Sequence, residues 1–200
     1  MTDPARGVQG DMAERVICVD EADQPIGEAG KLEAHERGLL HRAFSVFLFD
    51  CQNRLLLQRR ALTKYHSGGL WANSCCGHPR PEEPTVQAAV RRTREELGLV
   101  ADLHEGFRFR YRADLDNGLI ENELVHMMFG RPAGAFTPEP SEVASLRWMG
   151  LDELASDVAR TPSVYAPWVR LYVESGLEDL SSALASLAPT KFTVQSRPHL

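Results

Sequence analysis

Apolar and polar positions repeat along the chain with two different periods. Short apolar runs and strict alternation, both typical of β-strands, occur at residues 15–20, 43–50, 54–61, 107–113, 119–130 and 145–150. Apolar residues three and four positions apart, which predict helices, occur at residues 84–98, 151–160 and 167–187. The stretch DEADQPIGEAG, after the first strand, predicts a turn-rich loop. Because strands and helices interleave irregularly, we expect an α/β (α+β) fold with a mixed β-sheet flanked by helices.

The predicted strands differ in how much of their surface is buried. AFSVFLFD at 43–50 is almost wholly apolar, which predicts a strand buried on both faces. The short turn CQNR leads from it into 54–61 and predicts a hairpin between the two segments. FRFRYRA at 107–113 alternates strictly, so its aromatic side chains face one side and its arginines the other. The turn that joins it to strand 119–130 contains Asp116, Asn117 and Gly118.

The predicted helix at 84–98 has recognisable ends. Pro84 suits the first turn of a helix, where a missing N–H costs nothing, and Gly98 stops it. Its apolar residues form one row, which comprises Val86, Val90, Thr93 and Leu97. The row predicts the face that packs against the sheet.

Length and composition indicate one domain with a hydrophobic core. The chain has 200 residues, of which 43% are hydrophobic, and we expect a single domain over 15–188. Residues 1–14 and 189–200 look like a flexible N-terminus and a flexible tail. No stretch approaches the ~20 uninterrupted apolar residues that span a membrane. The N-terminal sequence also lacks the apolar run of a signal peptide, so we expect a cytoplasmic protein without membrane insertion. We also expect a monomer or weak dimer.

The charge of the chain narrows the class of partner. A net charge of −6 argues against general binding of nucleic acid. It leaves room for a local basic pocket, whose candidate residues are Arg59, Arg60, Lys64, Arg91, Arg92 and Arg94.

The segment NSCCGHP at 73–79 has three alternative interpretations: a metal clip, a redox pair, or the surroundings of one reactive thiol. Adjacent cysteines rarely bridge each other without strain, and four cysteines are too few for a disulfide scaffold. A structural zinc site needs more cysteines at wider spacing. Reduced thiols are therefore favoured.

A second group combines histidines with paired carboxylates. His35, His41 and His78 lie near the ends of predicted elements, although a single histidine is usually structural. Glu121 and Glu123 are two apart on a strand and so share one face. That face continues through Val125, Met127 and Phe129. Either this strand end projects into solvent, or the carboxylates belong to a metal or proton-transfer site, because burying two like charges needs compensation. Three imidazoles and two carboxylates suit Mn²⁺, Mg²⁺ or Zn²⁺.

A third group lies in RRTREELG at 91–98. Arg92 and Glu96 are four apart, so a surface ion pair is one interpretation. The wider spacing instead resembles the Nudix box, a loop–helix–loop that holds divalent cations against diphosphates. The matching residues are Gly77, Glu83, Arg91, Glu95, Glu96, Gly98 and Leu99. The chain departs from the box at Arg92, where the box has Glu, and this weakens the prediction of a hydrolase.

From about residue 15 to residue 170 the chain resembles the type I isopentenyl-diphosphate isomerases, which have the Nudix fold. The resemblance rests on AHERGLLH, RRALTK, WANSCCGHP, RRTREELG, FRYRA, ENE and APW, in the order of that family. It implies an extra N-terminal strand and a C-terminal helix around the Nudix sheet. The spacing from His35 to His41 is one residue shorter than in some relatives.

The resemblance also implies a role for each site residue. One divalent metal, Mn²⁺, Mg²⁺ or Zn²⁺, would be bound by His35, His41, His78, Glu121 and Glu123. Glu96 would hold a Mg²⁺ that bridges the diphosphate, and the diphosphate would meet Lys31, Arg60, Lys64 and Arg92. The catalytic groups would be Cys76, Glu123 and Tyr111, with Trp168 also lining the hydrocarbon pocket. Cys75 would be a small packing residue.

The implied reaction interconverts isopentenyl and dimethylallyl diphosphate. It adds a proton at one carbon and removes one from another through a carbocation-like state, so it needs an acid and a base across the substrate. Cys76 and Glu123 are the expected pair. Trp168 offers a π face to the cation, and its segment is expected to close as a lid. The alternative for Trp168 is a core tryptophan.

Two rival functions stay open from the sequence. One is a Nudix hydrolase of a diphosphate, against which Arg92 and Cys76 argue. The other is a metal-dependent binding module without activity, in which Cys76→Ala would change nothing.

Overall fold

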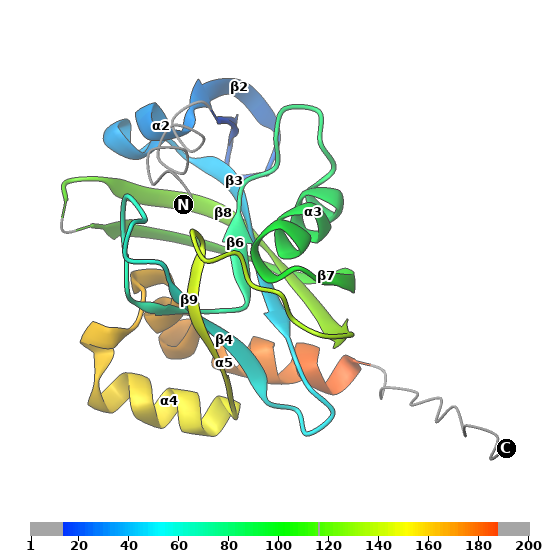
Figure 1. Ribbon diagram of the computed structural model, residues 1–200. Helices are drawn as coiled ribbons and strands as arrows, with labels where there is room; N and C mark the ends of the chain where they lie inside the picture. The colour runs from blue at the N-terminus through cyan, green and yellow to red at the C-terminus, as the bar shows by residue number, and fades with distance from the viewer. Residues whose placement is uncertain (1–13, 116, 188–200) are drawn as a thin grey trace, which may run out of the picture.

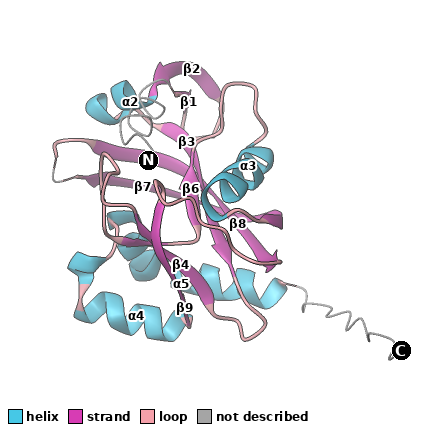
Figure 2. Ribbon diagram, in the orientation of Figure 1, coloured by secondary structure: helices cyan, strands magenta, loops and turns pink. Residues whose placement is uncertain are grey.

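The computed structural model describes residues 14–115 and 117–187, and in this part the strands form two sheets (Figures 1 and 2). The larger sheet has the order β2 (Pro25–Gly30), β1 (Arg15–Val19), β3 (His41–Leu48), β8 (Ile120–Ala133) and β7 (Val100–Asp114), with β6 (Cys75–Gly77) paired to β3. β3 and β8 run parallel and the other pairs are antiparallel. The sheet is therefore mixed, as expected.

The smaller sheet and the helices complete the fold. The smaller sheet has the order β5 (Trp71–Ala72), β4 (Leu55–Arg60) and β9 (Val143–Met149). The helices are α2 (Lys31–Arg37), α3 (Thr85–Leu97), α4 (Leu151–Arg160) and α5 (Pro167–Ser186), with a 3-10 turn at Pro162–Val164. In Figure 1, α2 lies beside β2 at one end of the molecule, and α4 and α5 lie together at the other. The expected α+β class is confirmed, including the N-terminal strand and the C-terminal helix.

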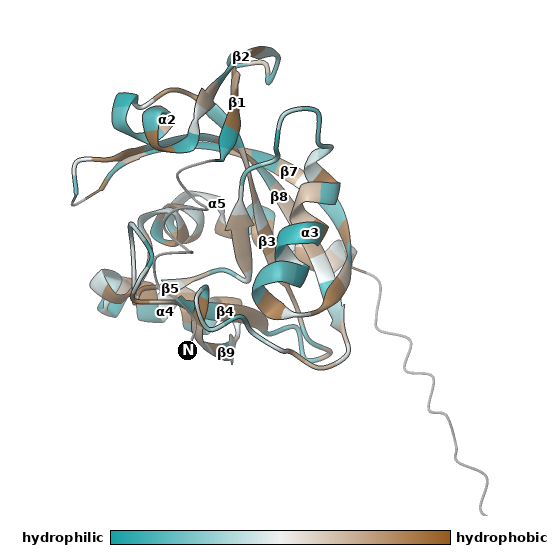
Figure 3. Ribbon diagram, turned by 45° about the horizontal axis from the view of Figure 1, so that its top comes forward, coloured by the Kyte–Doolittle hydropathy of each residue, from teal (hydrophilic) through white to brown (hydrophobic). Residues whose placement is uncertain are grey.

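Alternation along β3 divides the core into two parts. Phe44, Val46 and Leu48 pack with the buried residues of α3, whereas Ala43 and Phe47 pack with those of α4 and α5. Each of these five side chains is at most 2% exposed, which confirms that the strand is buried on both faces. In Figure 3 the middle of β3 is mainly hydrophobic, while α3 mixes both classes of residue. The large sheet therefore carries a helical layer on each face.

The predicted hairpin between β3 and β4 is wrong. β3 pairs with β1, β6 and β8, whereas β4 pairs with β5 and β9 in the other sheet. The two segments meet only at their ends, through an isolated bridge between Phe49 and Leu55 and hydrogen bonds between Asp50 and Arg54. The reason is physical: two strands that are apolar on both faces can each find partners elsewhere, and a short turn serves a crossing between sheets as well as a hairpin.

The predicted loop after β1 is shorter than expected. Its second half is β2, which pairs antiparallel with β1 and leaves only the turn around Asp20–Gln24. The short helix α2 follows directly, and no periodicity in the sequence had indicated it. β2 faces solvent along most of its length, so it lacks the apolar alternation that predicts a strand.

The helix α3 ends as predicted but starts one residue later. Pro84 is its N-cap and precedes the first turn, and Gly98 is the C-cap with φ +71°. A Cβ at Gly98 would lie 2.5 Å from the carbonyl oxygen of Thr137, so the position also needs glycine for space. Of the predicted apolar row, Thr93 and Leu97 are buried while Val86 and Val90 are half-buried. The buried face is shifted toward Ala88, Ala89 and Glu96.

The predicted flexible segments, 1–14 and 189–200, lie outside the described residues except for Glu14. Within the described residues, no helix has both the length and the apolar character needed to cross a membrane.

Candidate active site

Strand register brings the paired carboxylates to the centre of the site. His41 on β3 lies opposite Glu123 on parallel β8, and Tyr111 on antiparallel β7 lies opposite Glu123 from the other side. Glu121 and Glu123 point into the face that continues through the buried apolar residues of β8, and they are 3% and 7% exposed. The interpretation of this strand end as solvent-exposed is therefore wrong. Tyr111 donates a hydrogen bond to Glu123 Oε2 at 2.8 Å.

The three predicted histidines converge on these carboxylates from different elements. His35 comes from α2, His41 from the first position of β3, and His78 from the residue after β6. His78 Nε2 lies 2.9 Å from Glu123 Oε1 and 3.1 Å from His41 Nε2. His35 Nε2 lies 3.5 Å from Glu121 Oε2. The five residues expected from the sequence thus form one cluster.

Backbone carbonyls orient two of the imidazoles. His35 Nδ1 lies 2.7 Å from the carbonyl oxygen of Lys31, and His41 Nδ1 lies 2.8 Å from that of Leu39. Because a carbonyl only accepts, each Nδ1 carries a proton and donates it, and the other nitrogen, Nε2, faces the cluster. This is the arrangement in which a histidine serves as a metal ligand through Nε2.

Burial and neighbouring charges shift the pKa values of three members of the cluster. Burial alone would lower the pKa of His35, but the adjacent Glu121 carboxylate raises it above its ordinary value. For Glu123, burial would raise the pKa, but the hydrogen bond and charge of His41 lower it to about 2. Burial and the neighbouring His41 lower the pKa of His78 well below its ordinary value. Glu123 therefore stays ionised, and His78 stays neutral.

The cluster suits a divalent cation. Ligand atoms of His35, His41, His78 and Glu123 all lie within 4.8 Å of one another. His35 Nε2 and Glu121 Oε2 are buried without a hydrogen-bond partner in the described part of the chain. Such groups are costly in a folded protein unless something else satisfies them. Imidazole and carboxylate together fit Mn²⁺, Mg²⁺ or Zn²⁺, so the residues present fit the expected metal.

The two adjacent cysteines point to opposite faces of the sheet. Cys75 is buried in the core beside α3, as expected for a packing residue, whereas Cys76 packs on the side of α5. All four cysteines, each within the described residues, are free thiols. Strand alternation therefore excludes a redox pair between Cys75 and Cys76.

The thiol of Cys76 is held by polar neighbours. β6 pairs with β3 so that Cys76 lies opposite Ser45, whose Oγ is 3.5 Å from Sγ. The thiol donates to Asn73 Oδ1 at 3.1 Å. Burial raises the pKa of the Cys76 thiol to about 12, even though the hydrogen bond with Ser45 and the charge of Arg60 lower it. With this pKa the group is a protonated thiol at neutral pH.

One pocket contains both the thiol and the carboxylates. Among its lining residues are Cys76, Tyr111, Glu121, Glu123 and Trp168. Trp168, in the first turn of α5, is 3% exposed, and its indole N–H donates to Asn73 Oδ1 at 3.2 Å. The guanidinium of Arg60 lies 5.3 Å from its ring centroid. Trp168 is therefore both a core residue and part of the pocket wall.

The predicted diphosphate-binding residues line the same pocket. These residues are Lys31, Arg60, Lys64 and Arg92. Lys31 pairs with Glu14 at 3.1 Å and Lys64 with Glu142 at 2.8 Å. The basic pocket is thus real but smaller than the sequence suggested, since Arg59, Arg91 and Arg94 do not line it in the described structure.

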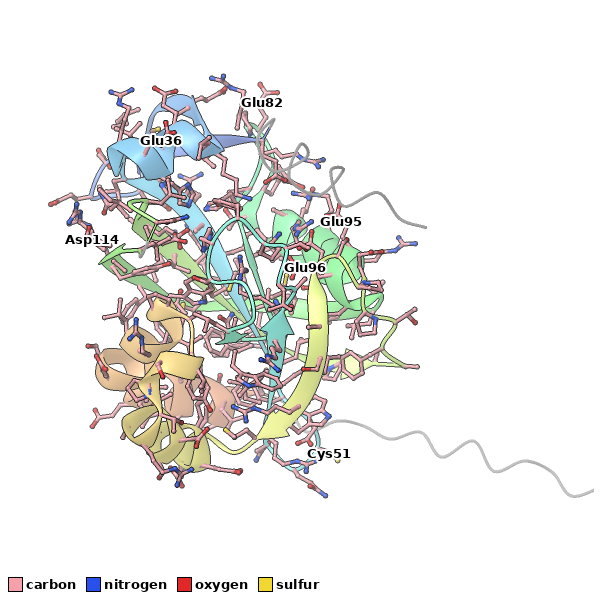
Figure 4. All side chains as sticks on the ribbon, turned by 60° about the vertical axis from the view of Figure 1, so that its left-hand side comes forward. Glu36, Cys51, Glu82, Glu95, Glu96 and Asp114 are labelled. Carbon is pink, nitrogen blue, oxygen red and sulfur yellow. The ribbon has the colours of Figure 1, made fainter. Side chains whose placement is uncertain are left out.

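Glu96 and Arg92 connect the helix α3 to the pocket. Arg92 donates to Glu96 Oε1 at 2.6 Å and to Glu95 Oε2 at 2.7 Å. Gln58 donates to the other oxygen of Glu96 at 3.0 Å. In Figure 4, Glu96 lies toward the centre of the molecule and Glu95 toward the surface. Arg92 and Glu96 therefore form a partly buried pair in the pocket wall, and the simple surface ion pair is excluded.

Sequence reasoning assigned no role to four residues at the site. Ser45, His66 and Tyr172 line the pocket, and Asn73 bonds the thiol. The hydroxyl oxygen of Tyr172 lies 2.9 Å from Ser45 Oγ. Burial raises the pKa of Tyr172 well above its ordinary value. His66 follows Tyr65 in a glycine-containing loop, where a lone histidine is no guide to function. For Asn73, the neighbouring cysteines were the only signal.

Comparison with known proteins places this geometry in a family. Residues 39–172 match the model of the NUDIX domain. The chain is 50% identical over 158 residues to Isopentenyl-diphosphate Delta-isomerase 2 of Aromatoleum aromaticum, covering 79% of this chain and 84% of that protein. It is also 50% identical over 163 residues to the Isopentenyl-diphosphate Delta-isomerase of Burkholderia multivorans, covering 82% and 93%.

Solved structures agree on the fold. The crystal structure of DR0079 from Deinococcus radiodurans has a TM-score of 0.67 at 18% identity, and covers 80% of this chain and 98% of its own. The MutT protein from Methanosarcina mazei has a TM-score of 0.56 at 14% identity, over 71% and 95%. At these identities the likeness concerns the fold alone. Together with the sequence matches, it means that the chain belongs to the NUDIX domain family and, within it, to the isopentenyl-diphosphate Delta-isomerases.

Proposed function

We propose that this protein interconverts isopentenyl diphosphate and dimethylallyl diphosphate by protonation and deprotonation of the hydrocarbon. The observation that carries the proposal is that Cys76 and Glu123 line one pocket, whose wall also contains four cationic side chains. A short alkene with an anionic tail matches this pocket, because the cationic side chains suit the tail and Cys76 and Glu123 suit the alkene. The family names of the relatives point to the same substrate.

The cationic residues bind the non-reacting end of the substrate. Arg60 and Arg92 offer guanidinium forks that suit phosphate oxygens, and Lys31 and Lys64 add point charges. Glu96 would hold Mg²⁺, which when bound would neutralise part of the diphosphate charge. Each oxygen of Glu96 already accepts one hydrogen bond and keeps further lone-pair capacity. Binding energy from this end positions a hydrocarbon that offers little grip itself.

The His/Glu cluster would hold the second divalent metal through His35, His41, His78, Glu121 and Glu123. That ion, Mn²⁺, Mg²⁺ or Zn²⁺, would orient the carboxylates and change their proton affinity when bound. Tyr111 holds the Oε2 oxygen of Glu123 by a hydrogen bond of 2.8 Å. This bond from β7 therefore holds the carboxylate on β8 before substrate arrives.

Proton transfer requires one group on each side of the alkene. Cys76 carries a proton at neutral pH, since burial raises its pKa to about 12. One of Cys76 and Glu123 delivers a proton to the terminal carbon, and the other removes a proton from C2. The tertiary carbocation-like state lies between these two events. Because the reaction is reversible, the two residues exchange roles with its direction.

Aromatic residues protect the cation from water. Trp168, Tyr111 and Tyr172 line the pocket, and all three are less than 10% exposed. Water reaching the cation would trap it as an alcohol, so a dry wall is part of the chemistry. The first turn of α5, which carries Trp168, is the segment that would open as a lid for the substrate.

Arg92 argues against hydrolysis as the main activity. Its guanidinium neutralises Glu95 and Glu96, at the position where the Nudix box supplies another carboxylate. A hydrolase gathers metal on those carboxylates, so a cation there favours a protein that grips diphosphate without cleaving it.

The test is incubation of the protein with isopentenyl diphosphate and Mg²⁺ in D₂O. Deuterium in a dimethylallyl product, with no phosphate released, is the result we expect. Released phosphate without rearrangement would overturn the proposal in favour of a hydrolase. A monomer or weak dimer, as expected from the sequence, is tested by light scattering of the same sample.

A further inference from the structure

His66 lies against the metal cluster, although nothing in the sequence had marked it. It belongs to the loop between β4 and β5, and its side chain is 8% exposed. Its Nε2 atom lies 3.4 Å from Glu121 Oε1, and its ring stacks on that of His35 with centroids 6.0 Å apart. The edge of its ring also contacts Trp168, with centroids 5.8 Å apart. His66 therefore touches both the cluster and the pocket wall.

Glu121 is placed between two imidazoles from different elements. Its Oε2 atom faces His35 at 3.5 Å, and its Oε1 atom faces His66 at 3.4 Å. A carboxylate that is fixed through one oxygen only can rotate about its own axis. A donor to the second oxygen removes that freedom, which is the role of outer-shell partners around metal ligands.

The neighbours of His66 allow it to act as this donor. Nδ1 lies 3.3 Å from the hydroxyl of Ser67, which can donate its proton to that nitrogen. The remaining ring proton is then on Nε2, the nitrogen that lies 3.4 Å from Glu121 Oε1.

A second metal ion does not fit the geometry. His35, His66 and Glu121 also have ligand atoms within 4.8 Å of one another, and so form a second group. Both groups contain His35, whose Nδ1 proton is donated to the Lys31 carbonyl. Its single lone pair on Nε2 can bind only one ion. The second group is therefore an extension of the first site.

We propose that His66 is a positioning residue, which donates its Nε2–H to Glu121 Oε1 and holds this carboxylate toward the metal. The inference rests on the metal site in the proposed function. It adds that the loop between β4 and β5 sets the affinity of that site. Through Trp168, the same imidazole connects the metal ligands to the wall of the hydrocarbon pocket.

The experiment compares Mn²⁺ binding by the wild-type protein and by variants at His66, without diphosphate, using the electron paramagnetic resonance signal of free Mn²⁺. His66→Phe keeps a ring but loses the donor, and we expect its Mn²⁺ affinity to fall by about 10- to 100-fold. His66→Gln places an amide N–H near the position of Nε2, and we expect it to restore affinity to within about threefold of wild type. His104→Phe, at an exposed position on β7, is the matched control and should bind as wild type.

Each result decides between named possibilities. His66→Phe with wild-type affinity would overturn the inference and leave the metal site standing. His66→Gln as weak as His66→Phe would also overturn it, because His66 would then be a direct ligand. His41→Ala identifies the signal, since it should abolish tight binding. A wild-type protein that binds no Mn²⁺ there would overturn the metal site itself. If His66→Phe does not fold, His66→Ala replaces it, with circular dichroism as the check of folding.

Discussion

Asn73 links the catalytic thiol, the pocket tryptophan and the backbone of the sheet through one buried amide. Its Nδ2 group donates to the carbonyl oxygens of Val46 and Cys75, both at 3.1 Å. Its Oδ1 atom accepts from Cys76 at 3.1 Å and from Trp168 at 3.2 Å. Asn73→Leu keeps the branching and the number of side-chain heavy atoms, with two larger methyl groups in place of the amide oxygen and nitrogen, and removes all four interactions. We therefore expect this variant to lose both stability and turnover.

The size of the stability loss follows from the partners left behind. The Val46 oxygen keeps a second donor, the N–H of Ser74 at 3.1 Å, so losing the amide costs little there beyond the bond itself. Among the described residues the indole N–H of Trp168 bonds Asn73 Oδ1, so in the variant it becomes a buried unsatisfied donor, at a cost of about 1–3 kcal/mol. With the two amide bonds at about 1 kcal/mol each, the total is about 3–5 kcal/mol. For a domain of this size that lowers Tm by roughly 6–20 °C.

The loss of turnover has a different cause. Without Asn73 Oδ1, the thiol of Cys76 keeps one hydrogen-bonding partner among the described residues, Ser45 Oγ at 3.5 Å. A misplacement of a reacting group by about 1 Å costs on the order of 10²-fold in rate. The assay pairs thermal melts by circular dichroism with initial rates of isomerisation at a temperature well below both melting points.

The matched control is Asn122→Leu, which removes one bond, from the side-chain amide to the Gly38 carbonyl at 2.9 Å, away from the thiol. It should lower Tm by a smaller amount and leave kcat unchanged. If Asn73→Leu melts and turns over like wild type, the reasoning about this amide is wrong. If it is destabilised but keeps the wild-type kcat, the amide does not position the thiol.

Three further predictions concern the thiol, an ion pair of the α3 loop, and the metal. Cys76→Ala should lower kcat by about 10²–10⁴-fold while calorimetry shows unchanged Mg²⁺-dependent binding of inorganic pyrophosphate, because the thiol does not touch the anionic end. Glu83→Gln should lose about 1–3 kcal/mol of stability at pH 7, since Arg91 donates to both carboxylate oxygens at 2.7 and 2.8 Å. Hydrogen bonds from Arg91 and from the Arg80 N–H lower the pKa of Glu83 below its ordinary 4.5. The contribution of this ion pair to stability is therefore present above pH 4.5 and is lost as pH falls through the folded-state pKa. Urea titrations at a series of pH values measure it. Removing divalent ions with a chelator should abolish turnover and lower Tm, and adding Mn²⁺ or Mg²⁺ should restore both.

Each of these has an outcome that would refute it. Wild-type turnover in Cys76→Ala would remove the thiol from the reaction. A stability difference for Glu83→Gln that grew in acid would mean that its partner is not Arg91. Full activity and an unchanged melting temperature after exhaustive chelation, verified by elemental analysis, would exclude a functional metal.

Local sequence patterns predicted more of the fold than of the candidate site. The apolar run of β3 and the alternation of β7 predicted those strands. A strand buried on both faces has a continuous apolar run, and a strand buried on one face alternates between apolar and polar residues. The hairpin between β3 and β4 failed because partner choice depends on the whole sheet, and no local residue encodes it. β2 was not predicted, because most of it faces solvent and its sequence lacks the apolar alternation of a strand.

Within the candidate site, the predictable residues are those with chemical identity and spacing in the chain. Glu121 and Glu123 could be placed on one face from the period of a strand alone. Their approach to the three histidines needed either the resemblance or the structure, because it depends on the parallel register of β3 and β8. His66 and Asn73 were missed for a related reason, since their roles exist only once loops far apart in sequence are brought together.

The central claim is that Cys76 and Glu123 act on opposite sides of one bound hydrocarbon chain. A crystal structure of the protein with Mg²⁺, Mn²⁺ and an unreactive analogue of isopentenyl diphosphate tests it most directly. We predict that Cys76 Sγ and a carboxylate oxygen of Glu123 each approach the analogue's hydrocarbon to about 3–4 Å, from opposite faces, with the diphosphate on Arg60 and Arg92. An analogue that met both groups from the same face, or lay in another pocket, would contradict the account.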